Sequence, residues 1–171
     1  MASTPSEKAT VLSRPPVRQS TIVRSDAEHT FDAFVRMIGA WWPVERLSLG
    51  GDRVRDVTLE PRLGGRVFET WDDGTIVDWG EVVAWEPSHR FVMSWLSTPS
   101  PTEVELSFAA LGPGLTRVSV EHRGWENLTD EQVREDCAEP GGYHSGAYSR
   151  GWQLALERFG AIVEPATGGA S

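Results

Sequence analysis

The stretch TEVELSFAALGPGLTRVSVEH, Thr102–His122, decides the class of fold. Apolar and polar residues alternate on both sides of Gly112–Gly114, and this period of two is typical of strands with one buried face. The Gly-Pro-Gly sequence suits a tight turn, because glycine adopts positive φ without strain. The stretch therefore predicts a β-hairpin. Its predicted inward-facing residues are Val104, Leu106, Phe108, Val118, Val120 and His122.

Five more segments have strand-like composition and are punctuated by turn residues. Short turns between consecutive strands imply antiparallel pairing, so the chain predicts a seven-stranded antiparallel meander. The predicted strands are Val17–Val23, Arg53–Glu60, Arg66–Trp71, Thr75–Trp85, Arg90–Leu96, Thr102–Ala110 and Leu115–His122.

The inward face is clear in some strands only. In Arg90–Leu96 we assign Phe91, Met93 and Trp95 to the interior. Arg66–Trp71 and Thr75–Trp85 leave two choices each, because apolar residues occur in both alternating sets. The competing sets of the first are Val67, Glu69 and Trp71 against Arg66, Phe68 and Thr70; those of the second are Val77, Trp79 and Val83 against Ile76, Gly80 and Val82.

Helical patterns flank the strands. Ser25 and Glu28 form a capping box with Ser25 as N-cap, and Gly39 and Pro43 interrupt the stripe that follows. A long helix is predicted from about residue 142 to residue 163. The stripes are Phe31, Phe34, Val35 and Ile38 in the first helix and Tyr148, Trp152, Ala155 and Phe159 in the last.

These elements predict an α+β domain in which a twisted sheet wraps around the long C-terminal helix. Such a sheet cannot close everywhere on one helix, and the gap is a natural ligand cavity. We expect residues 1–16 to be a disordered lead-in, 17–163 to be the domain and 164–171 to be a flexible tail.

Composition narrows the function. The 171 residues carry 25 acidic and 16 basic side chains, a net charge of −9 that argues against nucleic-acid binding. The single cysteine, Cys137, cannot form an internal disulfide, and no signal peptide or membrane span is evident, so a cytoplasmic location is expected. The chain has eight tryptophans, which must fill a core or line a cavity.

The acidic segment 126–139 contains six carboxylates and one arginine. A solvated face explains this charge run, with a partner-docking patch as the alternative. Thr129 and Gln132 form a weaker capping box that predicts one or two helical turns.

Several motifs, in this order, resemble the helix-grip, START-like fold of the SRPBCC superfamily, and more closely its branch named for the activator of heat-shock-protein-90 ATPase. The resemblance spans about residues 17 to 163. It implies a cavity that the superfamily uses for lipid carriage, hormone binding, cyclisation or co-chaperone work, and it suggests a role in stress response. The motifs are Ser25–Phe31, Trp41–Pro43, Gly64–Gly65, Gly80–Pro87, Arg90–Trp95, Gly114–His122 and Gly151–Trp152.

Aromatic residues form the candidate ligand site. Trp41 and Trp42 are expected near the cavity mouth, whereas Trp71 and Trp79 flank a predicted hairpin and pair across it in the simpler interpretation. A core role and an aromatic-walled pocket both remain open. The candidates are Trp41, Trp42, Trp71, Trp79, Trp95, Phe108, His122, Tyr148 and Trp152.

His122 is the best catalytic candidate, because its ordinary pKa suits a general base. A structural histidine near the strand end is the alternative. Glu69 and Asp78 could place a carboxylate in the cavity, or could bind Arg66 at the surface; His144 suits a surface or capping role. The histidine spacing predicts no metal site, and no motif predicts a cofactor.

The leading hypothesis is a binding module for a small hydrophobic or aromatic ligand. The alternatives are a cyclase or dehydratase using His122 with Glu69 or Asp78, and a co-chaperone-like protein with a chaperone partner. Exposed sheet edges would also allow a homodimer.

Overall fold

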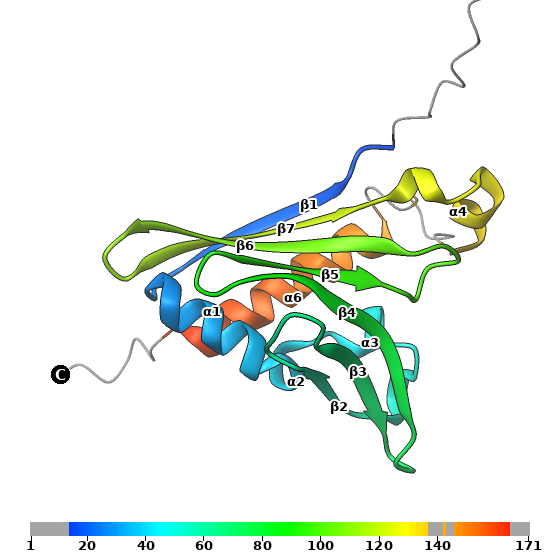
Figure 1. Ribbon diagram of the computed structural model, residues 1–171, viewed down its shortest axis with the longest axis horizontal. Helices are drawn as coiled ribbons and strands as arrows, with labels where there is room; N and C mark the ends of the chain where they lie inside the picture. The colour runs from blue at the N-terminus through cyan, green and yellow to red at the C-terminus, as the bar shows by residue number, and fades with distance from the viewer. Residues whose placement is uncertain (1–13, 137–141, 143–145, 165–171) are drawn as a thin grey trace, which may run out of the picture.

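A computed structural model describes residues 14–136, 142 and 146–164. A seven-stranded antiparallel sheet, in the order β1-β7-β6-β5-β4-β3-β2, curls around the C-terminal helix α6 (Figure 1). This is the α+β, helix-grip arrangement that the sequence predicts. The strands are β1 (Val17–Val23), β2 (Val54–Leu59), β3 (Arg66–Trp71), β4 (Ile76–Glu86), β5 (Arg90–Trp95), β6 (Thr102–Gly112) and β7 (Leu115–Arg123).

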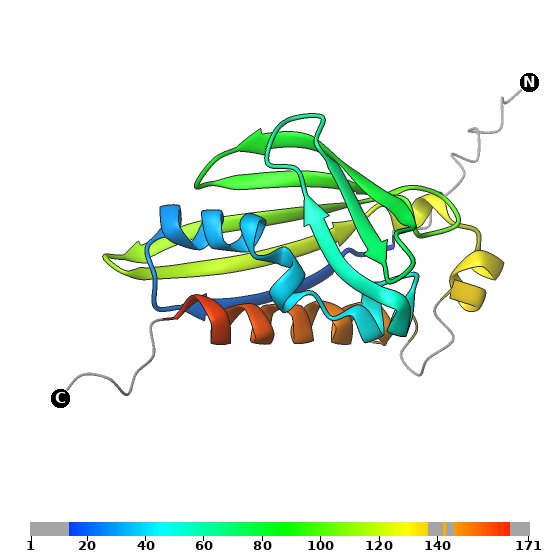
Figure 2. The same ribbon diagram turned by 90° about the horizontal axis from the view of Figure 1, so that it is seen from below.

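Helices α1, α2, α3 and α6 lie on one side of the sheet, whereas α4 lies beyond its end (Figure 2). α6 packs along β1, and α1 packs against β6 and α6. The short segments α2 and α3 connect α1 to β2. The helices are α1 (Ala27–Arg36), α2 (Ile38–Trp41), α3 (Val44–Leu47), η1 (Gly51–Arg53), η2 (Trp125–Asn127), α4 (Asp130–Asp136) and α6 (Ala147–Val163).

The predicted N-cap of α1 is wrong by one residue. Asp26 caps the helix, because its carboxylate accepts a hydrogen bond from the backbone N–H of His29 at 2.8 Å. Ser25 is buried, and its carbonyl accepts a hydrogen bond from the Thr116 hydroxyl at 2.7 Å. Either side chain suits an N-cap. The contact between Ser25 and β7 shows where the chain turns from β1 into the helix.

The second capping box is confirmed at the start of α4. The Thr129 hydroxyl accepts a hydrogen bond from Gln132 N at 3.1 Å, and the Gln132 side chain accepts one from Thr129 N at 2.9 Å. Of the acidic segment, Glu126, Asp130 and Glu131 are exposed; residues 137–139 lie outside the described residues.

The predicted faces of the hairpin and of β5 are confirmed, because all nine assigned inward residues are buried. The ambiguous faces of β3 and β4 have a physical cause. The register between these strands shifts between the pairs Val67↔Gly80 and Phe68↔Asp78, which leaves Trp79 as an extra residue. Trp79 and Gly80 are consequently both buried although they are adjacent. A β-bulge of this kind changes the face to which a side chain points, so the alternation of buried and exposed residues is interrupted there.

No helix among the described residues has both the length and the apolar character that crossing a membrane requires.

Candidate ligand site

Aromatic side chains fill the space between the sheet and α6. Trp42 stacks on Trp79 with ring centroids 4.8 Å apart, and Trp79 lies 5.1 Å from Trp95. Trp152, from α6, lies 5.6 Å from Trp95 and 5.7 Å from Trp42. These four tryptophans come from β4, β5, α6 and the link between α2 and α3, and all are nearly inaccessible to solvent. We call them the tryptophan cluster.

His122 and Tyr148 border the tryptophan cluster beside Trp95. The His122 ring lies 5.2 Å from the ring of Trp95 and 5.3 Å from that of Tyr148. Trp125 adds a third neighbour, 4.5 Å from the His122 ring, and its indole N–H donates to the His122 carbonyl at 2.9 Å. The sequence leaves Trp125 without a role, because it follows the end of a strand where no periodicity places it.

Both ring nitrogens of His122 have protein partners. Trp152 Nε1 donates to Nδ1 at 3.3 Å, so the proton of the neutral ring belongs on Nε2, which lies 2.7 Å from the Thr102 hydroxyl. The Thr102 hydroxyl lies 3.3 Å from that of Thr98, which donates to the Ser100 carbonyl at 2.7 Å. Donors and acceptors therefore alternate along one chain of hydrogen bonds.

Burial lowers the pKa of His122 to about 3, because the charged ring is poorly solvated in this interior. A proton on Nδ1 would also face the Trp152 N–H, which is a donor. The imidazole is thus neutral near pH 7, with its one lone pair engaged. This arrangement favours the structural alternative for His122 over the general base.

Glu69 is fully buried, and backbone and indole donors satisfy its carboxylate. Oε1 accepts from Gly50 N at 2.7 Å and from Trp71 Nε1 at 2.9 Å, and Oε2 accepts from Leu49 N at 3.2 Å. The carboxylate therefore ties the segment between α3 and η1 to β3. We call this segment, residues 48–50, the strap.

Asp78, the other carboxylate candidate, lies on the opposite face. It is exposed and forms an ion pair with Arg66 at 2.7 Å, as in the surface alternative. The structure thus separates Asp78 from His122. His144 lies outside the described residues.

The other aromatic candidates divide between two neighbourhoods. Phe108 and Trp41 belong to a phenylalanine-rich cluster under α1, where Phe34 lies 5.5 Å and 4.2 Å from them respectively. Trp71 lies outside the tryptophan cluster, with the Arg53 guanidinium 4.0 Å above its ring. It does not pair with Trp79 in the way the hairpin interpretation expects, because Trp71 lies opposite Thr75 at the turn, where its backbone N–H donates to the Thr75 carbonyl at 2.8 Å.

Two members of the tryptophan cluster differ from the other two members, and from three tryptophans outside it, in the hydrogen bonding of the indole N–H group. Trp41, Trp42, Trp71, Trp125 and Trp152 donate to protein acceptors. The Nε1 atoms of Trp79 and Trp95 are buried and have no acceptor among the described residues. The Ser97 hydroxyl, two residues beyond Trp95, is also buried and unpaired. Buried polar groups without partners are rare in native proteins, which makes this neighbourhood unusual.

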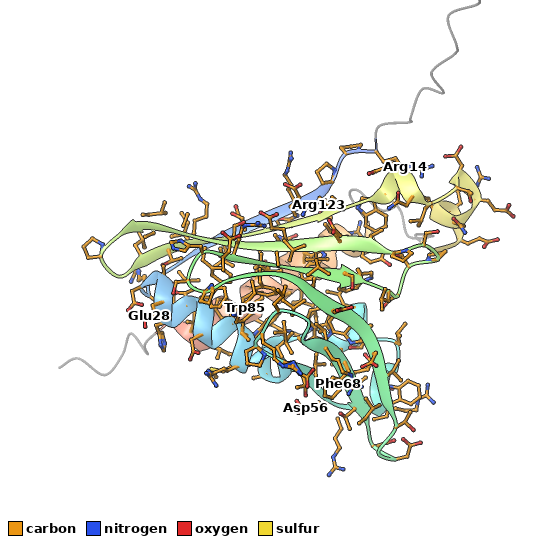
Figure 3. All side chains as sticks on the ribbon, viewed as in Figure 1. Arg14, Glu28, Asp56, Phe68, Trp85 and Arg123 are labelled. Atoms are coloured by element: carbon orange, nitrogen blue, oxygen red, sulfur yellow. The ribbon has the colours of Figure 1, made fainter. Side chains whose placement is uncertain are left out.

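Open hollows occur on the outside of the described part of the molecule. One, of about 450 Å³, lies on the outer face of β1, β7 and β6, and another, of about 560 Å³, lies between α1 and the β4–β5 turn. Trp85 lines the second hollow and packs 5.2 Å from Phe31 of α1, close to which Figure 3 shows it. The tryptophan cluster itself is closed by packed rings.

Comparison with known proteins agrees with this architecture. None of the curated proteins matches the chain. Among solved structures, protein MLL2253 from Mesorhizobium loti is similar at 19% identity and a TM-score of 0.60, covering 86% of this chain and 96% of that one. The self-sacrificing resistance protein CalC from Micromonospora echinospora is similar at 23% identity and a TM-score of 0.57, covering 87% and 94%.

A third similar structure is the anthrahydroquino-γ-pyrone synthase Txn09 complexed with SUM. It shares 26% identity with a TM-score of 0.51, covering 87% of this chain and 97% of that one. The model of one protein family matches residues 25–164, which is most of the chain. This chain therefore belongs to the family of activator of Hsp90 ATPase homolog 1-like proteins.

Proposed function

We propose that this protein binds a small hydrophobic or aromatic molecule between the sheet and α6, at the tryptophan cluster. The observation that carries the proposal is the pair of buried, unpaired indole N–H groups of Trp79 and Trp95. A purely structural core would leave these two donors uncompensated, whereas a ligand acceptor would satisfy them.

The surroundings of these two indoles suit such a ligand. Apolar and aromatic side chains with a few placed polar groups are the usual lining of small-molecule sites. Trp42 and Trp152 supply flat ring surfaces next to Trp79 and Trp95. The complex of Txn09 with SUM adds support from a protein of similar fold.

The ligand reaches the tryptophan cluster by displacement of the strap. Trp42 stacks on Trp79, and its indole N–H donates to Ser48 at 2.9 Å, so the strap and Trp42 move together. The strap is held by side-chain hydrogen bonds to Glu69 rather than by strand pairing. Elements with few such ties open at the lowest free energy.

A matched pair of variants on α6 tests the location. Ala155 is buried one turn beyond Trp152, and Ala161 is exposed on the same helix. With fluorene as the probe, we expect saturable quenching of tryptophan emission in the wild type and in Ala161→Leu. Ala155→Leu should weaken binding at least about tenfold, because the added side chain occupies space beside Trp152.

Native mass spectrometry should show one fluorene per chain, and thermal unfolding identifies any variant that has lost its fold. Absence of saturable binding of both fluorene and its ketone, fluorenone, to the folded wild type would refute the proposal. Equal affinity of folded Ala155→Leu and Ala161→Leu would place the ligand elsewhere. The cytoplasmic location, the role in stress response, the homodimer and the chaperone partner remain predictions from the sequence.

A further inference from the structure

The unpaired polar atoms of the interior are all able to donate. Among the described residues, the buried side-chain nitrogen and oxygen atoms without a partner are Trp79 Nε1, Trp95 Nε1 and Ser97 Oγ. An indole nitrogen is a donor only, and a hydroxyl is both donor and acceptor. A molecule that satisfies both indoles must present acceptor atoms.

The strong acceptors among the buried side chains are already engaged. Glu69 accepts three N–H bonds through its two oxygens. The lone pair of His122 Nδ1 accepts from Trp152, and the hydroxyls of Thr102 and Thr98 belong to the same chain. A ligand rich in donors would therefore find few free acceptors in this interior.

The charge of the interior disfavours an anion. The buried polar and charged side chains of the described residues include one carboxylate and one histidine, but no lysine or arginine. His122 is neutral, since burial lowers its pKa to about 3. None of these buried side chains would compensate the charge of a carboxylate or a phosphate transferred from water, and Glu69 would repel such an anion.

We propose that the ligand of this site is a neutral aromatic carbonyl compound, a ketone or quinone, whose oxygens accept hydrogen bonds from Trp79 and Trp95. This inference rests on the proposed function and narrows it. The rings of Trp42 and Trp152 pack on the aromatic skeleton of the ligand. The indole N–H groups of Trp79 and Trp95 donate hydrogen bonds to its carbonyl oxygen. Ser97 supplies a third donor at the same end of β5.

Three probes with one tricyclic skeleton separate these features. Fluorene has no acceptor, fluorenone carries a carbonyl, and fluorenecarboxylate carries an anionic group. Equilibrium dialysis gives the Kd of each probe for the wild type and for Trp79→Phe, Trp95→Phe and Trp42→Phe. The last variant is the matched control, because it removes an indole whose N–H is already paired with Ser48.

The decisive quantity is the ratio of the fluorene Kd to the fluorenone Kd in each protein. Trp79→Phe and Trp95→Phe should each lower this ratio about two- to tenfold relative to the wild type, the loss expected for one neutral hydrogen bond. Trp42→Phe should weaken both probes alike and leave the ratio unchanged. Fluorenecarboxylate should bind more weakly than either neutral probe.

An unchanged ratio in Trp79→Phe and Trp95→Phe, with fluorene still bound, would overturn this inference and leave the proposed function intact. Fluorenecarboxylate binding as tightly as fluorenone would overturn it as well. Failure of fluorene and fluorenone to bind the folded wild type would overturn the proposed function and this inference together.

Discussion

At the scale of single residues, the interior depends on paired polar atoms in an aromatic environment. His122 is held by Thr102 on one side and Trp152 on the other, so β6, β7 and α6 meet at one imidazole. A neutral histidine whose two nitrogens are both bonded adds specificity to the packing without the cost of a buried charge.

Removal of the Thr102 hydroxyl should show how much the fold depends on its hydrogen bond with His122. Thr102→Val keeps the shape of the side chain but leaves His122 Nε2–H without its acceptor. We expect the free energy of unfolding to fall by about 1–3 kcal/mol, the usual cost of a buried donor left unpaired. Urea unfolding monitored by circular dichroism measures the change.

Thr21→Val is the control for the same substitution. Thr21 is half-buried in β1, and its hydroxyl lies outside the chain of bonds that includes His122. Its free energy of unfolding should change by less than about 0.5 kcal/mol. Equal effects of the two variants would show that the bond between Thr102 and His122 contributes nothing measurable.

At the scale of elements, the strap is fixed by one carboxylate. Glu69 holds Leu49 and Gly50 by their backbone N–H groups, and the Trp71 ring covers Gly50 so closely that a Cβ there would lie 2.4 Å from Trp71 Nε1. A side chain at position 50 would therefore have to displace the Trp71 ring.

Glu69→Gln should loosen the strap while leaving the sheet intact. The amide group brings two N–H donors toward a site that already contains three, so at least one bond is lost. Amide hydrogens of Leu49 and Gly50 should exchange faster, and fluorene should associate faster. Hydrogen exchange measured by NMR and stopped-flow fluorescence test the two effects.

Asp78→Asn is the control, because Asp78 is an exposed carboxylate on β4. It should alter neither the exchange of the strap amides nor the association rate. If Glu69→Gln leaves both quantities at their wild-type values, the strap is not the route to the tryptophan cluster.

The elements also show how far the sequence predicts this molecule. Strand positions follow from alternation and turn residues, which are local, and each predicted strand is present. The face of β4 depends on a bulge at Trp79, which is a property of its pairing with β3. The unpaired indoles could not be predicted either, because hydrogen-bond partners such as Ser48 and Phe34 O become neighbours only in the folded chain.

At the scale of the whole molecule, polar chemistry is divided between two faces of the sheet. The outer face carries ion pairs between strands, such as that of Arg123 with Glu105 at 2.9 Å (Figure 3). Arg123 and Glu105 are both partly buried, so water screens their attraction only in part. The inner face contains His122, whose protonation is suppressed on folding, so the fold as a whole should respond to mild acid through this interior group.

The direction of that response follows from the lowered pKa. Folding depresses the pKa of His122 from its ordinary value of 6.5 to about 3, so between these values the unfolded chain binds more protons than the folded one. Stability should therefore be complete above about pH 6.5 and fall as the pH decreases, by about 2 kcal/mol at pH 5.

His122→Gln should remove most of this dependence, because glutamine does not titrate, whereas His29→Gln, at an exposed position of α1, should retain it. Urea unfolding of the three proteins at about pH 7.5 and pH 5 measures the effect, and a wild type equally stable at both values would contradict a neutral, buried His122.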